Sequence, residues 1–171
     1  MSDDNVIPFP SRSISIGGPI ESAEVSLCIH GEDLDPDEIT GILGLAPTHS
    51  HRRGDRRGPK SPPATMGAWL HSVGSDAPVE AAGDSRQPAD LVLGRLLDRL
   101  PSDPALWARL VQHYQIRIFF YISFEGFNKG FGLSARNIQR AAALGVPLEF
   151  DLYASDNDPP ELDDIFSRLE S

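Results

Sequence analysis

The chain of 171 residues contains a single cysteine, Cys28, so a disulfide bond within the chain is impossible. It also lacks long apolar runs, and no stretch approaches the roughly 20 apolar residues that a membrane-spanning helix requires. Residues 1–5 are acidic and do not resemble the start of a secretory signal peptide. Together these absences predict a cytoplasmic protein without a membrane partner.

Positive charge is scarce as well. Lys and Arg number 15 against 25 Asp and Glu, which gives a net charge of −10. This balance argues against broad binding to nucleic acids or anionic membranes, although it leaves room for a local basic site. The 15 Gly and 15 Pro lie mostly outside the apolar runs and predict long loops.

The length and the composition along the chain indicate one domain behind a terminal arm. Residues 1–22 contain Pro8, Pro10 and Pro19 among serines and show no apolar period, so we expect a flexible N-terminal arm. Residues 23–171 have the periodic patterns of a folded chain, and we expect them to form a single α+β domain.

The first part of this domain has a clear strand-then-helix pattern. Polar and apolar residues alternate over residues 24–30, which is typical of a half-buried strand. The following helix has Asp35 as its N-cap and ends at Gly44. Its predicted buried stripe consists of Ile39, Ile42 and Leu43.

The rest of the domain continues with similar signals. Trp69 stands alone in a polar region, so we expect its side chain to be buried, and a later helix is capped by Ser134 and ends at Gly145. The other predicted elements are strands over residues 49–55, 66–73, 114–124 and 148–155, and helices over 92–100, from 104, and over about 159–170. In the order β-α-β-β-α-β-α-β-α, they predict a mostly antiparallel sheet with helices packed on one face and a ferredoxin-like core.

Several blocks of this sequence are familiar together. They are Ile29-His30-Gly31-Glu32-Asp33-Leu34-Asp35-Pro36-Asp37-Glu38-Ile39-Thr40, Leu43-Gly44 with Pro47, Arg53-Gly54-Asp55, Gly67-x-Trp69, Leu133-Ser134, Leu144-Gly145 and Asp151-Leu152-Tyr153. In this order, over about residues 23–155, they resemble the bacterial family called domain of unknown function 4279. The resemblance implies no activity, cofactor or catalytic residue.

The residues themselves give no catalytic, cofactor or metal site. Cys28 lies in a predicted strand without the flanking residues of a nucleophile, so we expect a small, inert side chain. His49-x-His51 would point to one side of a strand, but the spacing supplies no third metal ligand. The acidic residues 32–38 fit the dipole at the start of a helix better than a calcium loop.

Two surfaces are candidates for contacts with a partner. The first is the basic stretch of residues 51–60, which we call the arginine loop; its candidate contacts are Arg52, Arg53, Asp55, Arg56, Arg57 and Lys60. The second is the sheet face opposite the helices, where Arg117, Phe119, Tyr121, Asp151 and Tyr153 can line up. Exposed aromatic residues there would suit a protein partner or a homodimer. If the C-terminal helix covers the face, they belong to the core.

The first functional hypothesis is a non-enzymatic, protein-binding module of regulatory or immunity type, which uses these two surfaces. A second hypothesis is an enzyme with polar groups around His30, Asp33 and Asp55. A third is binding of nucleic acid or another anion by the arginine loop, against which the net charge counts. For the loop itself, the alternative is that its charges balance Glu32, Asp33, Asp35 and Asp37.

Overall fold

The computed structural model describes residue 20 and residues 22–74, 88–126 and 129–154. The strands are β1 (Ser22–Gly31), β2 (His49–His51), β3 (Gly67–Gly74), β4 (Gln115–Phe124) and β5 (Leu148–Ala154). The helices are α1 (Pro36–Leu43), α2 (Pro88–Leu97), α3 (Pro104–His113) and α4 (Ala135–Ala143). The strands form one sheet in the order β2-β3-β1-β4-β5. Only the β4–β5 pair of this described sheet is parallel, so the predicted α+β class with a mostly antiparallel sheet is confirmed.

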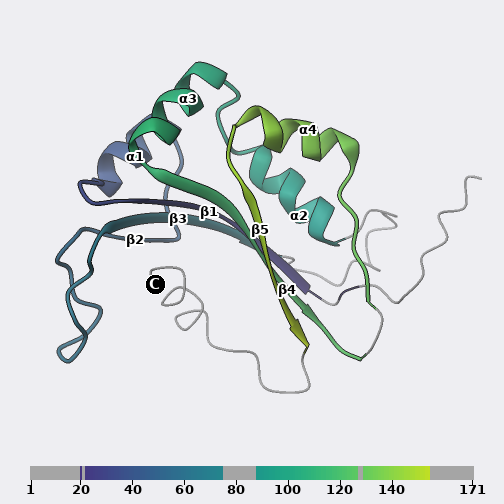
Figure 1. The fold of residues 1–171 in the computed structure, drawn as a ribbon, viewed down its shortest axis with the longest axis horizontal. Coiled ribbons are helices and arrows are strands. Elements are labelled where there is room, and N and C mark those ends of the chain that lie inside the picture. Colours follow the sequence, from purple (N-terminus) through teal and green to yellow (C-terminus); the bar gives the residue numbers. More distant parts are fainter. Residues whose placement is uncertain (1–19, 21, 75–87, 127–128, 155–171) are drawn as a thin grey trace, which may run out of the picture.

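All four described helices lie on one side of the sheet (Figure 1). Between the third and fourth strands the structure has two helices, α2 and α3, where the sequence predicts helices over 92–100 and from 104, although the predicted element order counts them as one. They are separate because α3 has its own start, with Pro104 in its first turn and the Asp103 side chain accepting a hydrogen bond from the Ala105 N–H. The predicted C-terminal helix lies outside the described residues.

The predicted N-terminal arm falls mostly outside the described residues too. Within its range, Ser22 already belongs to β1, and Ile20 is buried among the residues of the main core. The chain is therefore part of the folded domain from residue 20, and residues 1–19 are the part of the arm that the structure does not describe.

The predicted helix ends are found at the expected residues. Asp35 accepts a hydrogen bond from the Asp37 N–H at the start of α1, and Gly44 ends this helix with a left-handed φ of 63°. Ser134 caps α4 in the same way, and Gly145 follows that helix with a φ of 70°. Only glycine adopts such φ values at little cost, which explains both stops.

The predicted buried stripe of α1 is correct only in part. Ile39 and Leu43, which are four positions apart, are buried, but Ile42 is 37% exposed. Residues four apart lie on one face of a helix, and the adjacent position points to the side. Because α1 is short and its contacts with the sheet are made by that one stripe, Ile42 remains at the surface.

The main core lies between the helices and the near face of the sheet, which we call the first face. It includes alternate residues of β1 and β4 together with the apolar stripes of the helices. Trp69 of β3 is fully buried there, as the sequence predicts, and its indole N–H donates a hydrogen bond to Thr40 Oγ1 at 3.0 Å. This bond joins β3 to α1 and satisfies the polar atom of a buried aromatic residue.

A buried polar cluster holds α2 against α4. Asp90 Oδ1 of α2 accepts hydrogen bonds from the backbone N–H and the hydroxyl of Ser134, at 2.8 and 3.0 Å. It also accepts one from Asn137 Nδ2 at 2.9 Å. Asp90 and Asn137 are both buried, so these bonds replace water for polar groups inside the helix layer.

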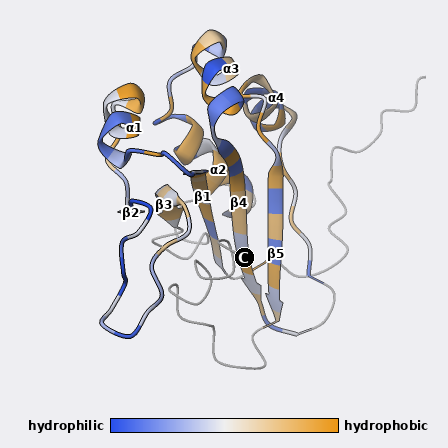
Figure 2. Ribbon diagram, turned by 60° about the vertical axis from the view of Figure 1, so that its left-hand side comes forward, coloured by the Kyte–Doolittle hydropathy of each residue, from blue (hydrophilic) through white to orange (hydrophobic). Residues whose placement is uncertain are grey.

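The other face of the sheet, which we call the second face, has a different composition. Neighbouring strands place His51, Ala68 and His30 in one row and His49, Leu70 and Cys28 in the next, which Arg117 of β4 extends. A small apolar cluster of Cys28, Ala68, Leu70 and Phe119 occupies its centre. Figure 2 shows the strongly hydrophilic connection after β2 beside the more hydrophobic central strands.

Candidate functional site

The arginine loop is a folded turn rather than an extended linker. Gly54, with a φ of 90°, donates its N–H to the Ala64 carbonyl, and the Ala64 N–H donates to the Asp55 carbonyl. The Asp55 carboxylate accepts a hydrogen bond from the Arg52 N–H at 2.8 Å. In Figure 1 the connection between β2 and β3 extends away from the helices, on the side of the second face.

The arginines of this loop are divided into two groups. Arg52 forms ion pairs with Asp35 at 2.6 Å and Asp37 at 2.8 Å, and Arg53 forms one with Glu32 at 3.1 Å. All three acids lie at or just before the start of α1. These two arginines therefore balance the acidic segment, as the alternative interpretation of the loop expects.

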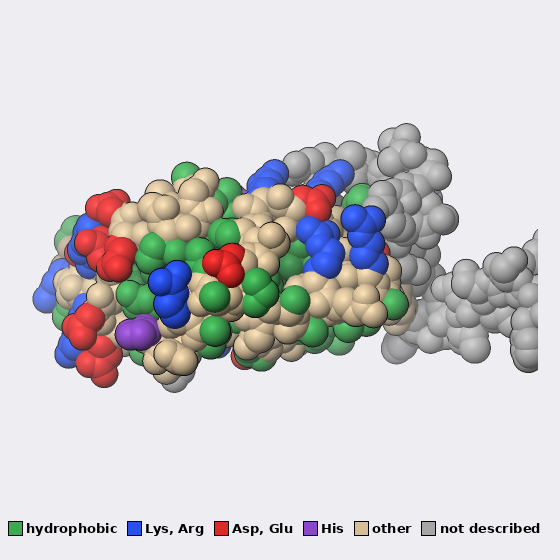
Figure 3. All heavy atoms as spheres, turned by 90° about the horizontal axis from the view of Figure 1, so that it is seen from above, with side chains coloured by type: hydrophobic (Ala, Val, Ile, Leu, Met, Phe, Trp, Pro, Cys, Tyr) green, Lys and Arg blue, Asp and Glu red, His purple; other side chains and the backbone are tan. Residues whose placement is uncertain are grey.

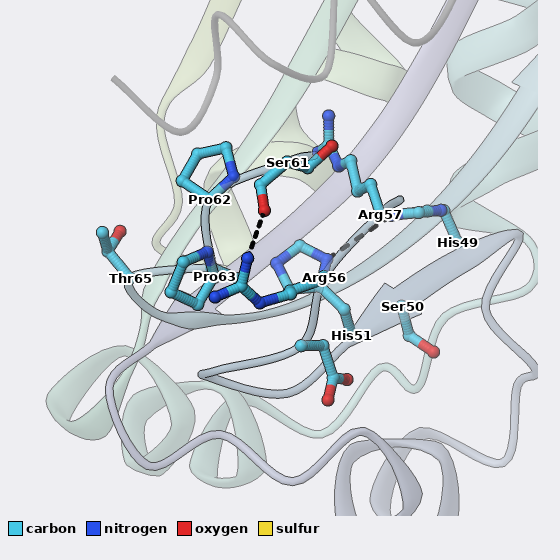
Figure 4. A pocket seen from close by; sticks show the side chains of 11 residues that line it. His49, Ser50, His51, Arg56, Arg57, Ser61, Pro62, Pro63 and Thr65 are labelled. Atoms are coloured by element: carbon cyan, nitrogen blue, oxygen red, sulfur yellow. Dashed lines mark hydrogen bonds between the residues drawn. The ribbon is translucent and has the colours of Figure 1, made fainter. Parts of the chain in front are cut away.

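Arg56 and Arg57 lie in different surroundings. Both line a cavity of about 700 Å³ between β2 and the connection to β3, together with His49, His51 and Asp55. Residues 61–65 form the opposite wall, and the Arg56 guanidinium donates to the Ser61 carbonyl at 3.0 Å (Figure 4). Arg56 has no ion pair with any of the described residues.

The two histidines of β2 point to the same side, as their spacing predicts. His51 Nδ1 lies 3.4 Å from His49 Nε2, and both rings face the cavity. Each histidine can donate or accept hydrogen bonds according to its protonation state. The cavity thus combines two guanidinium groups and two imidazoles within one short segment.

The candidate contacts on the sheet lie on the second face, apart from this cavity. Arg117 is 3.5 Å from Glu149, the rings of Tyr121 and Tyr153 are 4.7 Å apart, and the Tyr153 hydroxyl donates to Asp151 at 2.7 Å. Arg117, Tyr121, Asp151 and Tyr153 are half-buried, and Phe119 is buried. Strands β3 and β1 separate them from β2, so they do not form one site with Arg56 and Arg57. Lys60 is exposed and does not line the cavity.

Two ionisable groups of the second face have strongly shifted pKa values. Burial, assisted by the positive charges of Arg117 and His51, lowers the pKa of His30 to about 4. Burial raises the pKa of the Cys28 thiol to about 12. His30 is therefore neutral near pH 7, and Cys28 remains a protonated, unreactive thiol, as expected from its position in a strand.

A second cavity, of about 550 Å³, lies between the end of β1 and the end of α3. It is lined by His30, Asp33, His113 and Tyr114 among others, whereas Asp55 lines the first cavity. The three residues of the enzyme hypothesis are thus divided between two places. Sequence reasoning missed His113, because nothing in the local pattern indicates that the end of α3 meets the end of β1.

The described residues supply no group of three His, Cys, Asp or Glu side chains that could hold a metal ion. The helices in this part of the chain are also too short or too polar to cross a bilayer.

On the helix side, acidic and basic side chains lie interspersed at one end of the molecule (Figure 3). The cavity beside β2 brings together two guanidinium groups, two imidazoles and the Asp55 carboxylate.

The fold defines an α+β protein with four described helices on one face of a mixed five-stranded sheet. Residues 21–155 match the family described as Domain of unknown function (DUF4279), and the chain belongs to this family. The match confirms the resemblance seen in the sequence blocks. Comparison with curated proteins returned no match, and comparison with solved structures returned none either.

Proposed function

We propose that this protein is a non-enzymatic binding module that holds an acidic segment of a partner protein in the cavity beside β2. The observation that carries the proposal is the division of the arginine loop. Arg52 and Arg53 are ion-paired with acids of the same chain, whereas Arg56, which has no ion pair with any described residue, lines the cavity together with Arg57, His49 and His51.

The chemistry of these groups suits a carboxylate. A guanidinium presents several N–H donors in a planar fork that matches the two oxygens of a carboxylate. Arg56 uses Nη1 for the Ser61 carbonyl and has no acidic partner among the described residues. The cavity volume of about 700 Å³ lies within the range of ligand-binding pockets and would hold a few side chains.

A short acidic segment fits better than nucleic acid. The net charge of −10 repels a long polyanion, and the arginine loop is the place where positive charge gathers in the sequence. A short acidic peptide can place most of its carboxylates inside the cavity. Few of them then remain outside, where the net negative charge of the protein would repel them. The electrostatic attraction would raise the association rate and would weaken as salt is added.

The proposal extends to the fold of the core. In the sheet, β3 lies between β1 and β2, and β1 lies between β3 and β4. This interleaving supports a ferredoxin-like core of two split β-α-β units, to which α4 and β5 are added. A regulatory or immunity-type role in the cytoplasm stays a prediction, as does a homodimer through the sheet face.

The test compares two double variants with the same change of charge. Fluorescent oligoglutamate peptides are titrated with the protein at low and moderate salt, and binding is followed by anisotropy. We expect Arg56→Ser/Arg57→Ser to weaken binding at least tenfold, while Arg52→Ser/Arg53→Ser stays close to the unmodified protein. A single-stranded oligonucleotide serves as a second probe.

Two results would contradict the proposal. Equal losses in both double variants would mean that only total charge matters, and tighter binding of the oligonucleotide would favour the nucleic-acid alternative. Circular dichroism and urea denaturation of each variant establish that the fold is retained.

A further inference from the structure

The strand β5 is the free edge of the described sheet, at the end opposite β2 (Figure 2). On its other side it pairs with β4, where the Ile118 N–H donates to the Pro147 carbonyl and Ile118 lies opposite Leu148. In a strand, the N–H and C=O of one residue point to the same side, and successive residues alternate. The backbone groups that point away from β4 therefore belong to Leu148, Phe150 and Leu152. No other strand of the described sheet pairs with them.

Two of these residues also expose apolar side chains at this edge. They face the helix side, because they lie opposite the core residues Phe120 and Ile122 of β4. Phe150 stacks on Phe120 with ring centroids 4.6 Å apart, yet it remains 43% exposed, and Leu152 is 53% exposed. An apolar strand edge with unpaired backbone groups is a template for pairing with another strand.

The strand lacks the residues that usually protect such an edge. Its sequence, Leu148–Ala154, contains no Pro, Gly or Lys. Its charged residues are two acids of the second face, Glu149 and Asp151. Glu149 lies 3.5 Å from Arg117, whereas Asp151 accepts a hydrogen bond from the Tyr153 hydroxyl, and a carboxylate can accept several more. The edge therefore alternates apolar side chains on one face with acids on the other, as Figure 2 shows along β5.

These acids disfavour a second copy of the chain as the partner strand. A closed dimer would pair the two β5 strands antiparallel around a twofold axis. With the axis at Asp151 the two Asp151 carboxylates face each other, and with the axis at Phe150 each Asp151 faces Glu149, which destabilises a sheet. An axis at Leu152 avoids this contact but pairs only residues 150–154 of each strand. Each chain also carries a net charge of −10, so two copies repel each other.

We infer that the free edge of β5 binds an extended segment of a basic partner protein, which adds a strand to the sheet. The apolar residues of this segment lie beside Phe150 and Leu152, and the lysines or arginines between them lie opposite Asp151 and near Glu149. Backbone hydrogen bonds supply affinity in such a complex, and the alternation of side chains supplies specificity. The site lies at the opposite edge of the sheet from the cavity beside β2, so it is separate from the proposed function.

The test uses a fluorescein-labelled peptide of alternating Val and Lys, about seven residues long to match β5. Its binding to the full chain is followed by anisotropy, and a peptide with the same residues in separate Val and Lys blocks is the control. We expect the alternating peptide to bind at least tenfold more tightly than the block peptide. Leu152→Lys should weaken its binding at least tenfold, because a charge then lies on the apolar side of the edge. The matched variant Ile138→Lys makes the same change on α4, at a side chain that is 46% exposed, and should leave binding unchanged.

Two sets of N-methylated peptides test the backbone contact. Only every second residue of an added strand turns its N–H to the edge, so methylation of one set of alternate nitrogens removes these donors and methylation of the other set removes none. We expect one set alone to lose binding. Circular dichroism establishes that each protein variant is folded. The milder variant Asp151→Asn keeps the shape of the side chain and should reduce the affinity and its salt dependence.

Three results would overturn the inference. The first is equal binding of the alternating and the block peptides. The second is an equal effect of the two sets of N-methylated peptides. The third is a dimer of the unmodified chain in sedimentation equilibrium that Leu152→Lys dissociates, which would identify a second copy as the occupant of the edge. None of these results bears on the proposed function, because the oligoglutamate titration probes the other edge of the sheet.

Discussion

The two faces of the sheet show two ways to bury the same strands. On the first face, large apolar side chains such as Leu27, Trp69 and Phe120 meet the apolar stripes of the helices and form the main core. On the second face, the small apolar cluster of Cys28, Ala68, Leu70 and Phe119 is flanked by ionisable residues such as His30, Arg117 and Glu149. The first face therefore provides most of the hydrophobic stabilisation, whereas the second places ionisable groups where burial changes their pKa values.

This difference also separates stability from the proposed binding. The cavity with Arg56 and Arg57 lies beside β2, at the sheet edge farthest from β4 and β5. None of the residues that line it belongs to the main core, so we expect its side chains to change with little effect on folding. The helix layer, by contrast, is held together by the buried hydrogen bonds of Asp90 with Ser134 and Asn137, so substitutions there should reduce stability.

The largest expected effect comes from breaking the first face. Trp69→Ala removes a fully buried indole and its hydrogen bond to Thr40, and we expect a loss of about 3–5 kcal/mol in the free energy of unfolding. Urea denaturation measures it. Leu152→Ala, at a side chain that is 53% exposed, is the control and should cost far less. An unchanged midpoint for Trp69→Ala would mean that the core is not centred on this residue.

The next effect tests whether the helix layer depends on the buried carboxylate of Asp90. Asp90→Ala leaves the donors of Ser134 and Asn137 without their shared acceptor, which should cost about 3 kcal/mol. The matched control is Asp98→Ala, which removes an exposed ion pair with Arg140 and should cost about 1 kcal/mol or less. Equal losses in the two variants would show that the buried cluster contributes no more than a surface pair.

The smallest effect concerns the second face and depends on pH. Because the folded pKa of His30 is about 4, below the ordinary value of 6.5, the unfolded chain binds a proton between these values and the folded protein does not. Stability should therefore fall as the pH falls from about 6.5 to 4, and His30 should contribute on the order of 2 kcal/mol to this loss. Urea denaturation across this range should show a shallower pH dependence for His30→Gln.

The control for this measurement is His113→Gln, at an exposed histidine near the same end of the sheet. At pH 7 its free energy of unfolding should stay close to that of the unmodified protein, because the side chain is exposed. If His30→Gln retains the full pH dependence, His30 is not buried in the neutral form.

Much of this protein could be predicted from the sequence because the signals are local. The caps at Asp35 and Ser134, the stops at Gly44 and Gly145 and the alternation in β1 depend on residues within a few positions of each other. The burial of Trp69 follows from its size and its polar surroundings. Ile42 shows the limit of such reasoning, since its exposure depends on how far α1 extends over the sheet.

The sequence by itself determined the helices, the main strands, the α+β class and the family. Only the tertiary structure decided which arginines are paired, because Arg52 meets Asp35 across 17 positions and Arg53 meets Glu32 across 21. Asp90 likewise meets Asn137 across 47 positions. The physical reason is that hydrogen bonds and ion pairs act over a few ångströms, and such distances between remote residues are set by strand register and helix packing rather than by local pattern.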